Sequence, residues 1–252
     1  MSGFLKRVVV RGLGFLPVRF TESFVLRLVS LRVASLSPDQ ALRFLFGLDA
    51  TLCTLEVKKA IEYEGGMHTK HRHTRYHDFI VSRIRPDEWV LDIGCRIGAV
   101  AYDVAERADA PVVGIDLDPD KIVEARQRYA HPRVECRYGD ALEELPDRSF
   151  DVVILSNFLE HFSERPAFLR RVQKAVHPSC FIVRVPLLER DWRVPLKREL
   201  SVEWRLDPSH ETEYTLESFS QETVAAGLRI SHLEIRWGEI WAELLPNAST
   251  RS

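Results

Sequence analysis

An aspartate followed by two glycines, at Asp92, Gly94 and Gly98, is the part of this sequence best suited to bind a small ligand. An apolar run precedes the aspartate and a helical pattern follows the second glycine, which predicts a buried strand, a tight loop and a helix N-terminus. Such a loop lets a ligand lie against backbone N–H groups near the positive end of the helix dipole. Asp116 ends the next apolar run, where a carboxylate can accept hydrogen bonds from both hydroxyls of a ribose. The pattern therefore predicts a site for a nucleoside-like ligand.

Two nucleoside-like ligands compete for such a loop, a dinucleotide and S-adenosylmethionine. The dinucleotide fingerprint G-x-G-x-x-G/A would place its small residues at positions 94, 96 and 99. Gly94 and Ala99 agree with this fingerprint, but Arg96 stands at the middle position, and its side chain should obstruct the pyrophosphate. S-adenosylmethionine is therefore the better fit of the two ligands.

The chain resembles the class I S-adenosylmethionine-dependent methyltransferases, the superfamily that includes the small-molecule type 11 group. Four segments carry the resemblance in the family's order, namely residues 90–101, 112–116, 139–141 and 150–161, and the likeness extends over about residues 70–245. It implies an α/β, Rossmann-like fold whose seven-stranded, mostly parallel sheet ends in an antiparallel β-hairpin. It also implies S-adenosyl-L-methionine as the cofactor.

The resemblance implies cofactor contacts at the carboxyl ends of the strands, where open α/β sheets bind their ligands. Asp92 and the Gly94 backbone should meet the methionine portion, Asp140 the exocyclic amine of the adenine, and Leu117 the adenine face. An aspartate after a strand can instead be a helix cap or a turn former. The complete implied set is Asp92, Gly94, Cys95, Gly98, Asp116, Leu117, Asp140, Ala141 and Asn157.

Arg96 departs from the family pattern, which usually has glycine at this position. An arginine fits easily where φ is negative and is strained where the loop needs a positive φ. Three outcomes stay open. The guanidinium points outward, or it pairs with the methionine carboxylate, or it spoils the pocket and leaves a chain without catalytic activity.

Methyl transfer to a hydroxyl requires alignment, exclusion of water and a group that takes the hydroxyl proton. His161 follows the fourth expected strand and is the first candidate for that base, although it can instead only shape the loop. His210 is the second candidate, after a long connection that contains Trp192 and Trp204. Family members place acceptor contacts in this connection, and the alternative is a lid whose tryptophans cover the core.

The chain shows no pattern that favours a metal site. Four of the nine histidines lie within residues 68–77, but three basic residues among them would repel a cation, and the spacing matches no familiar zinc pattern. That segment is expected to close over the cofactor. Metal-dependent, catechol-type relatives have ligand acids after the fourth strand, where this chain has Ser156 and Asn157. The resemblance therefore implies a metal-independent enzyme.

Strand and helix patterns alternate from residue 87 onward, which indicates βαβ units and a parallel sheet. The last two strand-like runs have almost nothing between them and must form an antiparallel hairpin. We expect an N-terminal helical extension over residues 1–70 and a methyltransferase domain over 71–246, with an acceptor or lid insertion at 187–214. The expected strands are Trp89–Asp92, Pro111–Asp116, Arg133–Tyr138, Phe150–Leu155, Phe181–Val185, Leu228–Ile235 and Glu239–Leu245.

The composition limits the class of protein. A net charge of -2 gives no general attraction to nucleic acid, and four scattered cysteines argue against a disulfide framework. No apolar run reaches the ~20 residues that a membrane-spanning helix needs, and Arg11 and Gly12 interrupt what would be a signal-peptide core. We expect a cytoplasmic protein whose basic, apolar segment at residues 1–35 either packs on the catalytic domain or touches an anionic membrane surface.

These observations predict a metal-independent S-adenosylmethionine-dependent methyltransferase that acts on oxygen. The acceptor is a sugar hydroxyl of a glycan or glycolipid, or a small metabolite, and nucleic acid is not expected as a partner. The alternative is a catalytically silent, cofactor-binding adaptor at a membrane or in a complex. A nicotinamide dehydrogenase is disfavoured by Arg96 and by the terminal hairpin. The oligomeric state stays open.

Overall fold

A computed structural model describes residues 15–247 and divides them into two compact units. The first unit holds residues 15–59 together with Lys197–Val202, and the second holds residues 60–196 and 203–247. The predicted boundaries at residues 70/71 and 187–214 stay predictions, and residues 1–14 of the predicted basic segment lie outside the described residues. Each unit is described by itself below.

The first unit is helical, as the sequence predicts. It contains α2 (Val18–Ala34) and most of α3 (Pro38–Tyr63), and α2 buries none of its side chains among the described residues. Short contacts join α3 to the segment near residue 200, because the Lys197 ammonium lies 3.7 Å from Asp49 and the Arg43 guanidinium donates to the Leu200 carbonyl. Within residues 15–247, no helix combines the length and apolarity that a membrane span requires.

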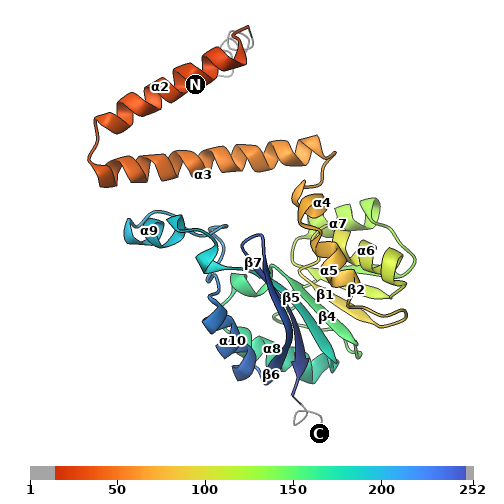
Figure 1. Cartoon of the computed structure of the whole chain (residues 1–252). Coiled ribbons are helices and arrows are strands. Elements are labelled where there is room, and N and C mark those ends of the chain that lie inside the picture. Colours follow the sequence, from red (N-terminus) through yellow and green to blue (C-terminus); the bar gives the residue numbers. More distant parts are fainter. Residues whose placement is uncertain (1–14, 248–252) are drawn as a thin grey trace. The chain divides into compact units, whose positions relative to one another are not determined.

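The second unit is built on one seven-stranded sheet with the order β3-β2-β1-β4-β5-β7-β6 (Figure 1). The strands β1 to β5 are parallel, β7 runs antiparallel to β5, and β6 pairs antiparallel with β7. Trp237 and Gly238 form the hairpin turn with φ of 54° and 74°, as a tight hairpin turn requires. The predicted sheet and its terminal hairpin are therefore confirmed. The strand bounds are β1 Val90–Ile93, β2 Val112–Asp116, β3 Val134–Tyr138, β4 Val152–Ser156, β5 Cys180–Pro186, β6 Leu228–Arg236 and β7 Glu239–Pro246.

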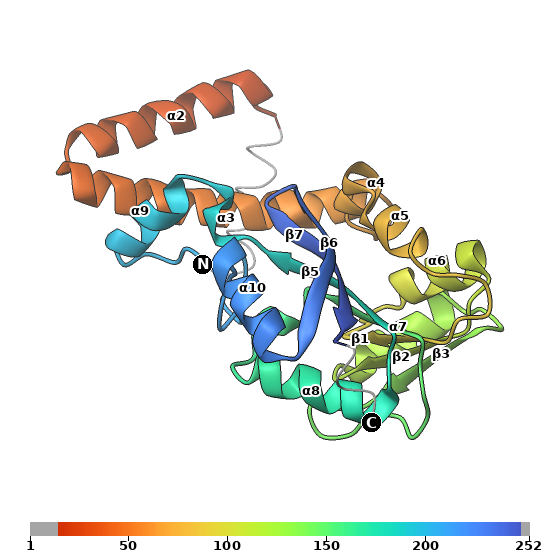
Figure 2. The same ribbon diagram turned by 60° about the horizontal axis from the view of Figure 1, so that its bottom comes forward.

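Helices cover both faces of the sheet, because successive side chains of a strand point to opposite faces. In β1, Val90 packs with α5 and α6, whereas Leu91 packs with α8 and α10, and both are fully buried. Figures 1 and 2 show α5, α6 and α7 on one side and α8 and α10 on the other. The helices of this unit are α4 Lys70–Thr74, α5 Tyr76–Val81, α6 Ala99–Ala108, α7 Pro119–Arg128, α8 Arg165–Val176 and α10 Leu216–Ala225, with α9 Arg193–Glu199 and the 3-10 turns η1 Leu159–His161 and η2 Leu188–Arg190 in the connections.

The strand order reverses between β1 and β4, which are neighbours in the sheet although two strands separate them in sequence. In open α/β sheets such a reversal leaves a crevice outside the carboxyl ends of the strands. The loops after β1, β2, β3 and β4 all reach this edge, and buried apolar side chains on both faces hold the strands that carry them. Each such side chain stabilises the fold by roughly 1.5–3 kcal/mol.

Candidate active site

A pocket of about 420 Å³ lies at this edge of the sheet. Its walls come from the loops that follow the first four strands, so residues far apart in the sequence share one cavity. Six of the nine predicted cofactor residues line it, and so does the candidate base His161. The lining residues are Gly94, Arg96, Ile115, Asp116, Leu117, Asp118, Lys121, Gly139, Asp140, Ala141, Leu142, Asn157, Phe158, His161 and Phe162.

The loop after β1 contains two glycines whose backbone conformation and close packing leave no room for a larger side chain. Gly94 has a φ of 77°, and a Cβ added there would lie 2.9 Å from Cδ2 of Phe158. Gly98 has a φ of 75° and caps the N-terminus of α6, where a Cβ would lie 3.2 Å from Ala125. Positive φ and close packing both exclude ordinary side chains. The loop therefore leaves backbone, rather than side chains, facing the pocket beside the N-terminus of α6.

Arg96 adopts the positive φ that its position requires, at 49°. Its backbone N–H donates a hydrogen bond to Oδ2 of Asp116 at 2.8 Å, and the N–H of Asp118 donates to Oδ1 at 2.9 Å. The Asp116 carboxylate is thus fixed at the pocket wall by two backbone donors. Each oxygen keeps a second lone pair, so the carboxylate can still accept hydrogen bonds from two vicinal hydroxyls.

The far end of the pocket combines one carboxylate with apolar walls. Oδ1 of Asp140 accepts a hydrogen bond from the N–H of Leu142 at 2.8 Å, and Ala141 beside it is buried. Leu117 is 58% exposed at the rim, where a flat ring could cover it. This end can take an apolar ring with an amine at its edge.

Two buried polar atoms near the ends of β1 and β4 have no partner in the part of the chain that the structure describes. Oδ2 of Asp92 and Oδ1 of Asn157 make no hydrogen bond within residues 15–247. Burial raises the pKa of Asp92 to about 8, and the nearby Cys136 and Asp116 add to the rise. An unpaired buried carboxylate is unfavourable, so a cationic ligand group near Asp92 would be stabilised.

Cys95 is not among the lining residues. Its side chain is buried against Gly114, where a Cβ would lie 2.8 Å from Cys95 Sγ, and it packs with Ile122, Ala125 and Cys136. Its N–H donates to the Ile115 carbonyl at 3.1 Å. The structure thus places Cys95 beneath the loop, and it places Gly98 and Asp92 behind the pocket wall rather than on its surface.

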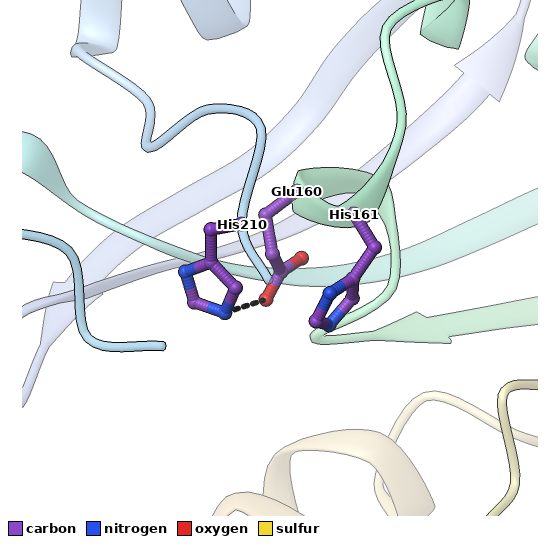
Figure 3. A group of neighbouring side chains, drawn as sticks. All are labelled: Glu160, His161 and His210. Carbon is purple, nitrogen blue, oxygen red and sulfur yellow. Dashed lines mark ion pairs between the residues drawn. The ribbon is translucent and has the colours of Figure 1, made fainter. Parts of the chain in front are cut away.

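His161 and His210 come together although 48 residues lie between them. Their ring centroids are 4.9 Å apart and nearly perpendicular, and Nε2 of His210 lies 4.0 Å from Oε1 of Glu160. Figure 3 shows the three side chains together, with the ion pair between His210 and Glu160 marked. Burial lowers the pKa of His161, with His210 adding to the effect, and burial raises the pKa of Glu160 to about 7. We call Glu160, His161 and His210 the glutamate–histidine cluster.

Two buried charged residues near the site were not singled out from the sequence. Arg184 interrupts the apolar strand β5, its Nε lies 2.8 Å from Oε2 of Glu239, and its guanidinium lies 3.8 Å from the ring centroid of Tyr76. Glu213 is buried beside His210 and pairs with Arg190. A charge inside an apolar strand was the signal that could have identified Arg184, whereas no local pattern marks Glu213.

The histidine-rich segment makes contacts of its own. Arg72 pairs with Glu64 at 2.9 Å. His77 bridges Asp103 at 2.6 Å and His71 at 2.9 Å, and burial lowers the pKa of His71 to about 3. None of residues 68–77 lines the described pocket. Their predicted closure over the cofactor stays a prediction.

The central part of the chain is similar to known methyltransferases. Residues 90–179 match the family described as "Methyltransferase domain". The 2-methyl-6-phytyl-1,4-hydroquinone methyltransferase of Synechocystis sp. is 29% identical over 154 residues, which are 57% of this chain and 47% of that protein. Phosphoethanolamine N-methyltransferase 3 of Arabidopsis thaliana is 36% identical over 99 residues, which are 38% of this chain and 20% of that protein. The chain thus spans less than half the length of these curated relatives.

Solved structures agree on the fold. The DhpI–SAH complex superposes with a TM-score of 0.56 at 20% identity and covers 77% of this chain and 95% of that one. A TehB-like SAM-dependent methyltransferase from Corynebacterium glutamicum superposes with a TM-score of 0.53 at 14% identity and covers 79% of this chain and 99% of that one. Residues 90–179 therefore match the methyltransferase domain family, and the chain that carries them has the fold of the class I S-adenosylmethionine-dependent methyltransferases.

Proposed function

We propose that this protein transfers a methyl group from S-adenosylmethionine to a hydroxyl oxygen of a small or glycan acceptor. The observation that carries the proposal is the single pocket in which the Gly94 loop, Asp116, Asp140 and His161 meet. A glycine loop, a ribose-binding carboxylate and a candidate proton acceptor lie within one cavity.

The residues at the two ends of the pocket fit this cofactor. The orphaned Oδ2 of Asp92 suits the methionine ammonium, and the backbone of Gly94, which carries no side chain, lines the pocket and suits a close-lying methionine portion. Asp116 suits the ribose hydroxyls, and Asp140 the adenine amine, with Leu117 against the ring. When bound, the cofactor supplies a methyl group on a positively charged sulfur, which is an excellent leaving group.

The protein's own contribution is alignment, exclusion of water and management of one proton. Phe158 and Phe162 line the pocket beside His161 and keep that wall apolar. The acceptor hydroxyl must lose its proton as the oxygen attacks, and the glutamate–histidine cluster reaches the pocket through His161. Because His161 contacts the pocket and His210 contacts His161, both predicted catalytic residues can take part.

The tryptophans of the connection after β5 bear on the nature of the acceptor. The relatives named above differ in their substrates, a phosphoethanolamine in one and a hydroquinone in the other. The preference for a sugar comes from the tryptophans of the connection, of which Trp192 is 72% exposed. An exposed indole can stack on the apolar face of a sugar ring. His210, at the end of the same connection, brings it to the cluster beside the pocket.

The test is methyl transfer from labelled S-adenosylmethionine to fractionated extracts and to a panel of glycans, glycolipids and hydroxylated metabolites. The proposal expects a labelled product with a 14-dalton gain, and Asp116→Ala should abolish its formation. Gln127→Ala, an exposed change on α7, serves as the control and should leave the product unchanged. A product methylated on nitrogen or carbon would contradict the oxygen acceptor.

A second candidate is a cofactor-binding adaptor without catalytic activity. The apolar residues exposed on α2, such as Phe20, Phe24 and Leu28, favour it because they suit a membrane surface or a partner. Cofactor binding without any labelled product would support the adaptor. Cytoplasmic location and peripheral membrane contact stay predictions in both cases.

A further inference from the structure

We propose that the glutamate–histidine cluster, Glu160, His161 and His210, binds one divalent transition-metal ion such as Zn²⁺. Two imidazole nitrogens and one carboxylate oxygen suit ions of this class. The three atoms that the residues offer lie within 4.8 Å of one another, and Oε1 of Glu160 is 4.0 Å from Nε2 of His210. Zinc bonds of about 2.0–2.1 Å at tetrahedral angles place ligand atoms roughly 3.3 Å apart. The exposed His161 can supply most of the movement that this needs.

The contact between His161 and Ser209 fixes the tautomer of the His161 ring. Nδ1 of His161 lies 3.2 Å from the Ser209 hydroxyl, and that hydroxyl donates its only hydrogen to Oδ1 of Asp207 at 2.7 Å. Ser209 can therefore only accept from His161, so Nδ1 carries the hydrogen and the lone pair stays on Nε2. This tautomer would bind a metal ion through Nε2.

His210 is oriented in the same way by a buried carboxylate. Its Nδ1 lies 3.3 Å from Oε1 of Glu213, which accepts hydrogen bonds and cannot donate when it is ionised. The N–H of Leu206 and the Arg190 guanidinium also donate to Glu213 and hold it in place. A carboxylate behind the histidine fixes the ring and makes its free nitrogen more basic, as in many zinc sites. Nε2 of His210 therefore faces Glu160.

The buried carboxylate of Glu160 gives an independent indication that the cluster binds a cation. Its side chain is fully buried, and neither of its carboxylate oxygens has a hydrogen-bond partner within the described part of the chain. A buried carboxylate normally has such a partner. The nearby cation Arg184 does not serve, because it pairs with Glu239. A metal ion between Glu160 and the two histidines would provide the missing partner.

The location of the cluster gives the ion a role that rests on the proposed function. Three protein ligands leave one coordination position for water or substrate. Since His161 lines the pocket, that position faces the place of the acceptor. With the ion bound, the imidazole nitrogens would coordinate it and would no longer accept the acceptor's proton as they do in the metal-free proposal. The cation would instead lower the pKa of an acceptor hydroxyl that contacts it, and the released proton would pass to water. The inference takes the place of the expected metal independence, which considered the histidine-rich segment at residues 68–77 and the residues directly after the fourth strand.

Direct metal binding tests the inference. The full chain is freed of metal by dialysis against a chelator and titrated with Co²⁺, with visible absorption and calorimetry as readouts, and Zn²⁺ is then added in competition. We expect one Co²⁺ per chain, displaced by Zn²⁺, and binding at least 100-fold weaker in Glu160→Gln and in His210→Gln. His232→Gln is the matched control, because His232 also lies near a glutamate, 3.9 Å from Glu234, but on the outer hairpin.

Binding with one equivalent in the wild type and in His232→Gln, and its loss in the cluster variants, supports the inference. Equal binding by all four proteins, or no binding by the wild type at 100 µM Co²⁺ (roughly a Kd above 10⁻⁴ M), overturns it. If a buried variant misfolds by circular dichroism, His161→Gln replaces it, since this side chain is exposed. Calorimetry with S-adenosylhomocysteine on the same samples separates the two proposals, because cofactor binding can survive when metal binding fails.

Discussion

Replacing Asp92 by asparagine should stabilise the folded chain while it weakens cofactor binding. The Asp92 carboxyl is fully buried with a raised pKa of about 8, against an ordinary value of 3.8. At pH 7 the folded chain therefore keeps this group protonated, whereas the unfolded chain has it ionised. Each pKa unit corresponds to about 1.4 kcal/mol, so the difference between 3.8 and pH 7 costs the folded state about 4 kcal/mol.

Asparagine is neutral in both states and avoids most of this cost, so the free energy of unfolding should rise by about 2–4 kcal/mol at pH 7. The sign of the pH dependence follows from the same reasoning. Because the folded chain binds the extra proton, the destabilisation begins above pH 3.8, grows with pH and levels off above about 8. Asp92→Asn should lose this slope. The same change removes the negative charge that would face the methionine ammonium, so binding of S-adenosylhomocysteine should weaken at least tenfold.

Urea denaturation between pH 4 and pH 9 measures both effects. Asp116→Asn is the control, because Asp116 already accepts two backbone hydrogen bonds and its replacement should bring no gain in stability. If Asp92→Asn is no more stable than the wild type at pH 7, or if its free energy of unfolding keeps the same pH dependence, then Asp92 is not a buried carboxyl with a raised pKa that destabilises the folded chain.

Three further predictions follow from single residues. Gly94→Ala should lower the free energy of unfolding by about 1–2 kcal/mol, because residue 94 has a positive φ. It should also weaken cofactor binding more than tenfold, because the added Cβ meets Phe158. Gly47→Ala, at an open helical position, is the control and should show neither loss when stability is measured by denaturation and binding by calorimetry. Arg96→Gly should raise the stability by about 0.5–1 kcal/mol and change the Kd for S-adenosylhomocysteine less than threefold, because glycine keeps the N–H that holds Asp116. Binding of S-adenosylhomocysteine at pH 7 should release close to one proton, since the pKa of about 8 at Asp92 must fall beside an ammonium; calorimetry in two buffers of different ionisation enthalpy would show no such difference if Asp92 is already ionised.

Much of the fold was accessible from the sequence because its signals are local. Apolar runs that end in an acid, such as the one before Asp116, identify strands of a parallel sheet, and the short gap at Trp237 and Gly238 admits only a hairpin. The sequence also predicted that Asp116, Asp140 and Asn157 would lie close together, because they end or follow parallel strands, which end at one edge of the sheet. Cys95 shows the limit of this reasoning, because the direction of a side chain in a loop depends on what packs beneath it.

The cluster beside the pocket could not be predicted in the same way. His161 and His210 meet only because the connection after β5 folds back to β4, and the sequence gives no measure of where a long connection returns. Glu160 reads as an ordinary polar residue of a loop until its burial is known. The expectation of metal independence considered neighbours in sequence, whereas the structure assembles the cluster from segments almost 50 residues apart.

Calorimetric titration of the full chain with S-adenosylhomocysteine tests the central claim most directly. If the pocket between the Gly94 loop, Asp116 and Asp140 is a cofactor site, one molecule should bind per chain, and Asp116→Ala should weaken binding at least tenfold. An absence of heat at high micromolar ligand, or equal binding by the wild type and by Asp116→Ala, would contradict the account.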